Sequence, residues 1–303
     1  QGRPWNTGVY LARYPAGRVR LCLDVKGYLR AILIAMALPL LSNLFMGLAG
    51  FLQLRSTSVG WNEALRAAAQ APLNFALVQA AAVGVIFVIA FRDKEPNDGF
   101  LEAVHVRPLA GSLVAACFIA GLFLQIPLAE VGNLVQELWP ISFEQLARRF
   151  GLVNPTTWWG GVSALIALVL VAPVTEELLF RGWLMKELEA QYGAPKALIW
   201  SSVLFGAVHM AHPSSILYAT LGGLVLGAVA LRTRSTLGSI AMHAGVNALP
   251  LLLPPTLLRI EGFNTLDPQV EHISPWLVLL SVLLAAGMLA AIWRSTTPLG
   301  PDE

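Results

Sequence analysis

The chain has 303 residues, of which 56% are hydrophobic and 13% charged, and its mean hydropathy is +0.66. A soluble globular domain carries about 25% charged residues, so this composition argues against a water-soluble protein and predicts a polytopic membrane protein. The net charge is +2 with dispersed basic residues, which argues against nucleic acid as a partner. Two cysteines, Cys22 and Cys117, support neither a disulfide framework nor a metal cluster.

Eight apolar runs predict an all-α fold: a polytopic membrane helix bundle of about eight transmembrane helices with interfacial helices. The fourth run begins at Trp158 and passes through Pro173 into an acidic pair, and the fifth to seventh runs are short and rich in glycine. In chain order the other seven are 31–54, 71–91, 109–129, 196–211, 214–231, 236–253 and 275–293.

These runs divide the chain into five segments. Arg and Lys are denser before the first run and after the second, fourth and sixth, which predicts that both termini are cytoplasmic. The segments are a cytoplasmic or interfacial segment, 1–30; the first three helices, 31–129; an external loop with an amphipathic helix, 130–157; a core rich in buried polar residues, 158–253; and an external loop, last helix and tail, 254–303.

Three charged residues interrupt the fourth apolar run, in "VTEELLFRG". A charge at the centre of a membrane helix costs about 2.5–3.5 kcal/mol, so such residues face protein or trapped water. Glu177 and Arg181 are four residues apart and share a helix face, which predicts an internal ion pair. Glu176 lies about 100° around the helix, so it needs a partner from another helix. Pro173 predicts a bend just before this group.

Two later motifs place histidines in apolar runs. In "FGAVHMAHP", His209 follows Phe205 by four residues, and in "HAGVN", His243 precedes Asn247 by four, so each pair shares a helix face. Interhelical polar contact is the alternative interpretation for the second pair, and an interfacial side chain is the alternative for His212. Polar contacts of that kind are also the interpretation of Asn43, Asn74, Gln79 and Gln125.

Position along the helices predicts which polar residues meet. Glu176 is 17 residues before the turn at Gly193 and His209 is 16 after it, so both lie roughly 24–26 Å from the turn at 1.5 Å per residue. Their side chains are therefore expected to be level. His243 is eight residues beyond a turn at Ser235, which places it lower unless the fourth helix projects beyond the membrane.

A carboxylate level with an imidazole can activate water, and a His–Asn pair can donate hydrogen bonds to an oxyanion, so the residues predict hydrolysis of a peptide bond. Zinc bound by histidines and a carboxylate is the competing prediction. The His-Glu-x-x-His pattern is missing, and "HMAH" contains no glutamate, so no cofactor is predicted.

"EELLFR", "FGAVH" and "HAGVN", in this order over three helices, resemble the motifs of the CPBP family, the CAAX-processing and bacteriocin-processing (Abi) membrane proteases. The resemblance covers 158–253 and implies a glutamate intramembrane endopeptidase with an eight-helix core. It assigns water activation to Glu176 and His209, and oxyanion stabilisation to His243 and Asn247. The supporting residues that it implies are Glu177, Arg181 and Phe205.

The resemblance implies a membrane-embedded peptide or protein as substrate, with the lipid bilayer as surroundings and a membrane-complex partner left open. The composition, richer in Arg than Lys, favours a bacterial inner membrane and an unprenylated substrate over a prenylated one. Two alternatives remain: a catalytically silent membrane subunit or chaperone on the same scaffold, and a proton-coupled transporter.

Overall fold

The computed structural model describes residues 25–56, 60–91 and 99–296, and over these residues the fold is entirely helical, without strands. The predicted all-α fold class is therefore confirmed. Residues 1–24, most of the predicted N-terminal segment 1–30, lie outside the described residues.

The eight predicted apolar helices are present. Two of them, α10 and α12, are shorter than a full membrane span. The eight are α1 (Val25–Ser56), α3 (Pro72–Phe91), α5 (Gly111–Leu138), a composite helix (Trp158–Tyr192), α10 (Ala194–Val208), α11 (Pro213–Thr233), α12 (Thr236–Leu252) and α13 (Pro275–Ser295).

The composite helix changes its winding along its length. Two π-helical segments interrupt it, one on each side of the short α8, and such segments are frequent at functional sites. Its parts are α7 (Trp158–Ala164), η1 (Leu165–Val171), α8 (Ala172–Glu177), η2 (Leu178–Leu184) and α9 (Met185–Tyr192).

Three smaller helices complete the described chain. The predicted amphipathic helix in 130–157 corresponds to α6 (Phe143–Val153), which begins with a capping box between Ser142 and Gln145. The preceding helix α5 continues to Leu138, beyond its predicted end at 129. Two short helices were not predicted, α2 (Trp61–Gln70) and α4 (Phe100–Ala103).

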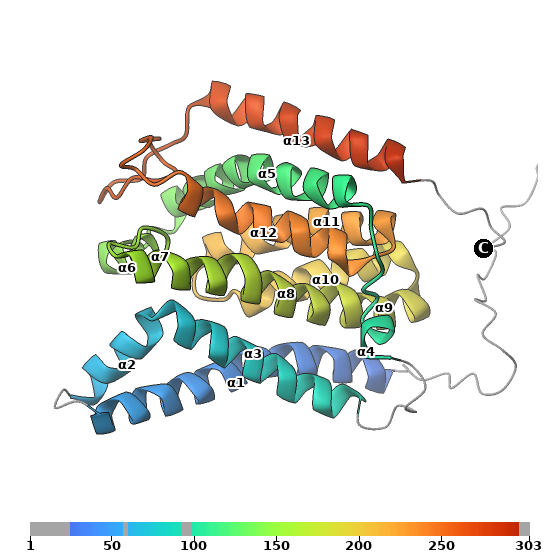
Figure 1. Cartoon of the computed structure of the whole chain (residues 1–303), viewed down its shortest axis with the longest axis horizontal. Helices are drawn as coiled ribbons and strands as arrows, with labels where there is room; N and C mark the ends of the chain where they lie inside the picture. The colour runs from blue at the N-terminus through green and yellow to red at the C-terminus, as the bar shows by residue number, and fades with distance from the viewer. Residues whose placement is uncertain (1–24, 57–59, 92–98, 297–303) are drawn as a thin grey trace, which may run out of the picture.

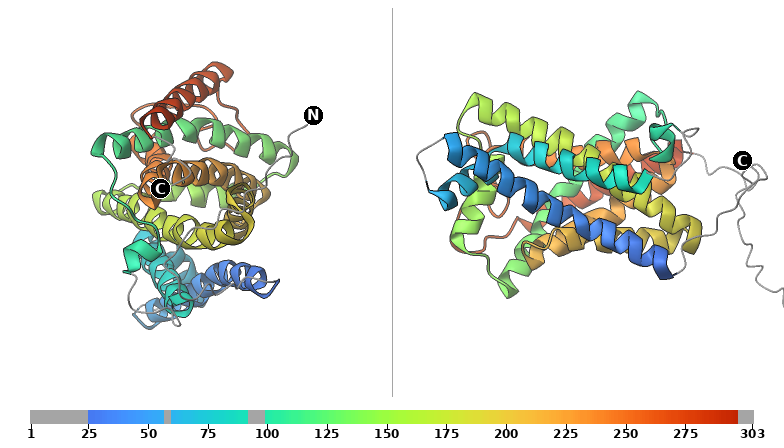
Figure 2. Two further views of the ribbon diagram at one scale, coloured as in Figure 1. Left: turned by 90° about the vertical axis from the view of Figure 1, so that its right-hand side faces the viewer. Right: turned by 90° about the horizontal axis from the view of Figure 1, so that it is seen from below.

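The helices lie roughly antiparallel in layers (Figures 1 and 2). The pair α1 and α3 forms one side of the bundle, α5 and α13 form the opposite side, and the composite helix lies between them with α10–α12 (Figure 1). Glycines bring α5 and α12 into backbone contact, because a Cβ atom on Gly245 would lie 2.0 Å from the Phe118 carbonyl oxygen. Small residues allow such close approach of membrane helices.

One end of the bundle carries exposed tryptophans. This end holds α2, α6 and the loop between α12 and α13, on the left of Figure 1. Tryptophan is enriched where a membrane protein crosses the interface between lipid and water, so these side chains mark one membrane boundary. The exposed tryptophans at this end are Trp61, Trp139, Trp158, Trp159 and Trp276.

Candidate active site

Glu176 lies in α8, in the middle of the bundle, with only 8% of its surface exposed. Its two carboxylate oxygens have different surroundings. Oε1 accepts a hydrogen bond of 2.6 Å from Nε2 of Gln79 on α3. Oε2 lies 4.0 Å from Nε2 of His209 and 3.9 Å from Nε2 of His243. Glu176 was expected to need a partner from another helix, and it has three neighbours of this kind: Gln79, His209 and His243.

His209 is fixed by the end of α10. This helix ends at Val208, so the prediction that the fifth helix extends to 211 with His209 inside it is wrong. With 15 residues, α10 is about 22 Å long, which is less than the roughly 30 Å hydrocarbon core.

The last turn of α10 also selects the tautomer of His209. The last carbonyls of a helix lack backbone donors, and Nδ1 of His209 lies 2.7 Å from the carbonyl oxygen of Phe205. Because a carbonyl only accepts, Nδ1 carries the proton of this bond. In a neutral ring Nε2, which faces Glu176, is then the acceptor.

His243 joins α12 to both glutamates. Its Nδ1 donates to Oε1 of Glu177 at 3.0 Å, and its Nε2 faces Glu176. A count of 1.5 Å per residue placed His243 lower than Glu176. The two turns are not level, because Thr236 donates to the Val104 carbonyl oxygen at 2.8 Å and the same oxygen lies against Gly182, well before the turn at Gly193. The composite helix therefore extends past the turn at Ser235, which is the condition under which His243 was expected to join the site.

The predicted ion pair between Glu177 and Arg181 is present, with 2.9 Å between Oε1 and Nη1 and neither side chain exposed. Arg181 also donates to the carbonyl oxygen of Gly223 on α11 at 3.0 Å. Its guanidinium carbon lies 4.3 Å from the centre of the Phe205 ring, within cation–π range. Glu177, Arg181 and Phe205 thus join the composite helix to α10 and α11 directly behind Glu176.

Asn247 is bound to the π-helical segment η1 of the composite helix. Its Nδ2 donates to the carbonyl oxygen of Leu168 at 2.8 Å. In η1 the N–H of Ala172 bonds to the carbonyl five residues back, at Ala167. In the same pattern the N–H of residue 173 would donate to the carbonyl oxygen of Leu168, but residue 173 is a proline and has no N–H. The side chain of Asn247 replaces that missing backbone donor.

The other polar residues divide by role. Gln79 makes the predicted interhelical polar contact, and its partner is Glu176 itself. Its place in an apolar helix drew attention to Gln79, but its spacing did not indicate which residue it would contact. Gln125 does join helices, accepting a hydrogen bond from the Tyr218 hydroxyl. Asn43 instead binds the carbonyl of Pro39 in its own helix. His212 caps the start of α11, accepting from the N–H of Ser214.

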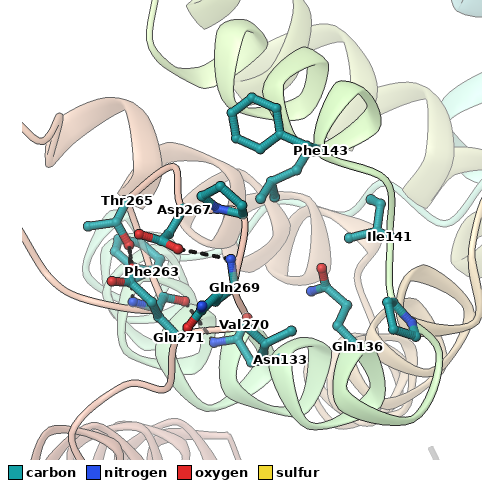
Figure 3. A pocket seen from close by; sticks show the side chains of 14 residues that line it. Asn133, Gln136, Ile141, Phe143, Phe263, Thr265, Asp267, Gln269, Val270 and Glu271 are labelled. Carbon is teal, nitrogen blue, oxygen red and sulfur yellow. Dashed lines mark hydrogen bonds between the residues drawn. The ribbon is translucent and has the colours of Figure 1, made fainter.

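A cavity of about 140 Å³ lies apart from these residues, at the tryptophan-rich end of the bundle. Figure 3 shows its lining, which comes from the end of α5, the start of α6 and the loop 262–271. None of the sequence-motif residues lines it. Within the described ranges, no group of three or more His, Cys, Asp or Glu side chains is arranged to hold a metal ion.

Residues 157–249, from α7 to α12, match the family model for type II CAAX prenyl endopeptidases of the Rce1-like kind. This match confirms the resemblance to the CPBP family. It spans the three motifs and about a third of the chain. It supports a CAAX-type intramembrane endopeptidase as the general activity of the CPBP-like segment and, with the apolar helices, an integral membrane protein. No curated protein and no solved structure matches the chain.

Proposed function

We propose that this chain is an intramembrane endopeptidase that hydrolyses a peptide bond with water activated by Glu176 and His209. The supporting observation is that Oε2 of the buried Glu176 side chain lies 4.0 Å from Nε2 of His209 and 3.9 Å from Nε2 of His243. Both separations exceed a direct hydrogen bond, and one water molecule between these atoms would donate one hydrogen to Oε2 and the other to Nε2 of His209.

In the proposed reaction, the carboxylate of Glu176 takes a proton from the water as the water oxygen adds to the carbonyl carbon of the scissile bond. His209 orients the water through the lone pair on Nε2. The tetrahedral intermediate collapses with rupture of the C–N bond, and Glu176 returns the proton to the departing amine nitrogen. One water is consumed, and a carboxylic acid and an amine are formed, which become a carboxylate and an ammonium group at neutral pH.

We assign oxyanion stabilisation to His243 and Asn247. When Nε2 of His243 is protonated, it donates toward the substrate oxygen while Glu177 balances the charge through Nδ1. An asparagine amide has two hydrogens, and the bond to Leu168 uses only one of those of Asn247. The other is available to the substrate. The proposed chemistry uses no metal and no cofactor.

The proposed substrate is a membrane-associated peptide or protein. The matched family is named for prenyl endopeptidases acting on CAAX tails, so a prenylated C-terminal peptide is the first substrate to test. The sequence composition favours an unprenylated bacterial peptide, cleaved at the inner membrane, as the second. We further propose that both termini are cytoplasmic, in keeping with the distribution of Arg and Lys.

The test uses the full chain in lipid nanodiscs with a farnesylated CAAX peptide and the same peptide without the lipid. Glu176→Gln and His209→Ala should each lower cleavage by about 100-fold or more, as expected for loss of a general base. Glu189→Gln is the matched control, since Glu189 pairs with Lys186 on the surface of α9 and should leave cleavage unchanged.

Cleavage that survives both active-site changes would contradict the proposal and favour another active site. Loss of cleavage on zinc chelation would favour a zinc-dependent mechanism instead. A silent subunit would cleave neither peptide in any form. A transporter would show substrate or ion flux and retain part of it in Glu176→Asp.

A further inference from the structure

Gln79 reaches the proposed base from outside the family-matched segment. It lies in α3, is only 6% exposed, and donates to Oε1 of Glu176 at 2.6 Å. The same Nε2 donates to Oγ1 of Thr175 at 3.2 Å. One amide nitrogen carries two hydrogens, so both are engaged with neighbouring residues of α8.

The hydroxyl of Thr175 fixes the orientation of that amide. Its own hydrogen goes to the backbone carbonyl oxygen of Val171 at 2.7 Å, so toward Gln79 the hydroxyl oxygen can only accept. A carboxylate oxygen also only accepts. Both partners therefore require the nitrogen of Gln79, and a rotated amide would place its oxygen against two acceptors.

This arrangement determines which oxygen of Glu176 faces the imidazoles. A glutamate side chain alone turns freely about its last bond, and its two oxygens are equivalent. With Oε1 held by Gln79, Oε2 is the oxygen left toward His209 and His243. Catalysis gains from such fixed placement of a base.

We propose that Gln79 is a positioning residue of the site: its amide holds Oε1 of Glu176 so that Oε2 is presented to water. This inference rests on the proposed function, in which Glu176 is the base. It also makes the helix pair α1 and α3 part of the active unit, because α3 supplies the side chain that orients the base.

The experiment compares Gln79→Leu with Gln125→Leu in the full chain. Gln125 is a matched control because it is also a buried glutamine bonded to another helix, through Tyr218. Gln79→Leu should lower kcat by about 10- to 100-fold, the range seen when support of an active-site ligand is removed, with KM nearly unchanged. Gln125→Leu should lower kcat by less than about threefold, within the reach of its indirect effect on packing.

A second readout does not depend on activity. Gln79→Leu and Glu176→Ala should be non-additive in thermal unfolding, because either change alone removes the hydrogen bond between the two side chains. Two outcomes would overturn the inference but leave the proposed function standing, provided that cleavage still depends on Glu176. One is additive effects on thermal unfolding, and the other is an equal loss of kcat in Gln79→Leu and Gln125→Leu. Absence of Glu176-dependent cleavage in the unaltered chain would overturn the proposed function and this inference together.

Discussion

The residues around Glu176 divide between those that face its free oxygen and those that hold the helices in place. His209 and His243 face Oε2, while Arg181 binds Glu177 and the Gly223 carbonyl behind it. Asn247 belongs to both groups, since it bonds to segment η1 of the composite helix and has a second amide hydrogen that this bond does not use. The contribution of Asn247 to stability can be measured separately from its contribution to cleavage.

Asn247→Ala should destabilise the protein by about 1–3 kcal/mol, because the Leu168 carbonyl loses its donor inside the bundle. Pro173→Ala restores a backbone N–H at the position from which a donor is missing. In the Pro173→Ala background, Asn247→Ala should therefore cost clearly less. The comparison requires unfolding of the unaltered chain, both single variants and the double variant in the same detergent. If Asn247→Ala lowers stability equally in both backgrounds, the Asn247 side chain does not replace the missing backbone donor.

At the scale of elements, the site depends on close contact between α5 and α12. Gly245 is two residues from His243, and a Cβ atom there would lie 2.0 Å from the Phe118 carbonyl oxygen of α5. Gly245→Ala should force the helices apart, lower stability by about 1–3 kcal/mol and reduce cleavage. Gly287→Ala is the control, since no atom lies within 4 Å of its Cβ position. Equal melting temperatures for the two variants would contradict this packing.

The loop between α12 and α13 is tied to α5 by His272, whose ring lies 2.7 Å from Glu130 and 3.1 Å from Glu137. Hydrogen bonds to Glu130 and then Glu137 raise the pKa of His272 above its ordinary 6.5. A raised pKa stabilises the folded loop most at low pH, and this contribution is lost as pH rises through the raised value.

Hydrogen exchange of residues 262–273 should therefore be slower at about pH 6 than at about pH 9, after correction for the intrinsic pH dependence of exchange. His272→Ala should abolish the corrected difference. If the corrected exchange rates of the variant still differ between the two pH values, groups other than His272 cause the pH dependence.

The sequence predicted the elements better than their ends and winding. Runs of apolar residues located all eight helices, because the need to bury backbone polar groups in lipid is a strong constraint. The end of α10 at Val208 and the π-segments were not predicted, since they depend on which tertiary donors replace lost backbone bonds, as Asn247 does for Leu168. The three motifs predicted the candidate site. Gln79 belongs to no motif, and its partner lies 97 positions away in the chain, so its role could not be predicted.

For the whole molecule, the proposed orientation places the tryptophan-rich end outside the cell and the turn between α9 and α10 inside. Cysteine introduced at exposed Gln269 should react with an impermeant maleimide in intact cells. Cysteine at exposed Lys196 should react only after permeabilisation. Both variants start from a chain in which Cys22 and Cys117 are replaced by serine and alanine. The reverse labelling pattern would invert the proposed topology.

Glu176-dependent cleavage of membrane-associated polypeptides is tested most directly by comparing the termini of these polypeptides in cells that carry either the unaltered chain or Glu176→Ala at equal levels. Specific N- and C-termini that cleavage creates in the presence of the unaltered chain should disappear in the variant, and the corresponding uncleaved tails should accumulate. Identical sets of termini in the two strains, with both proteins folded in the membrane, would contradict Glu176-dependent cleavage.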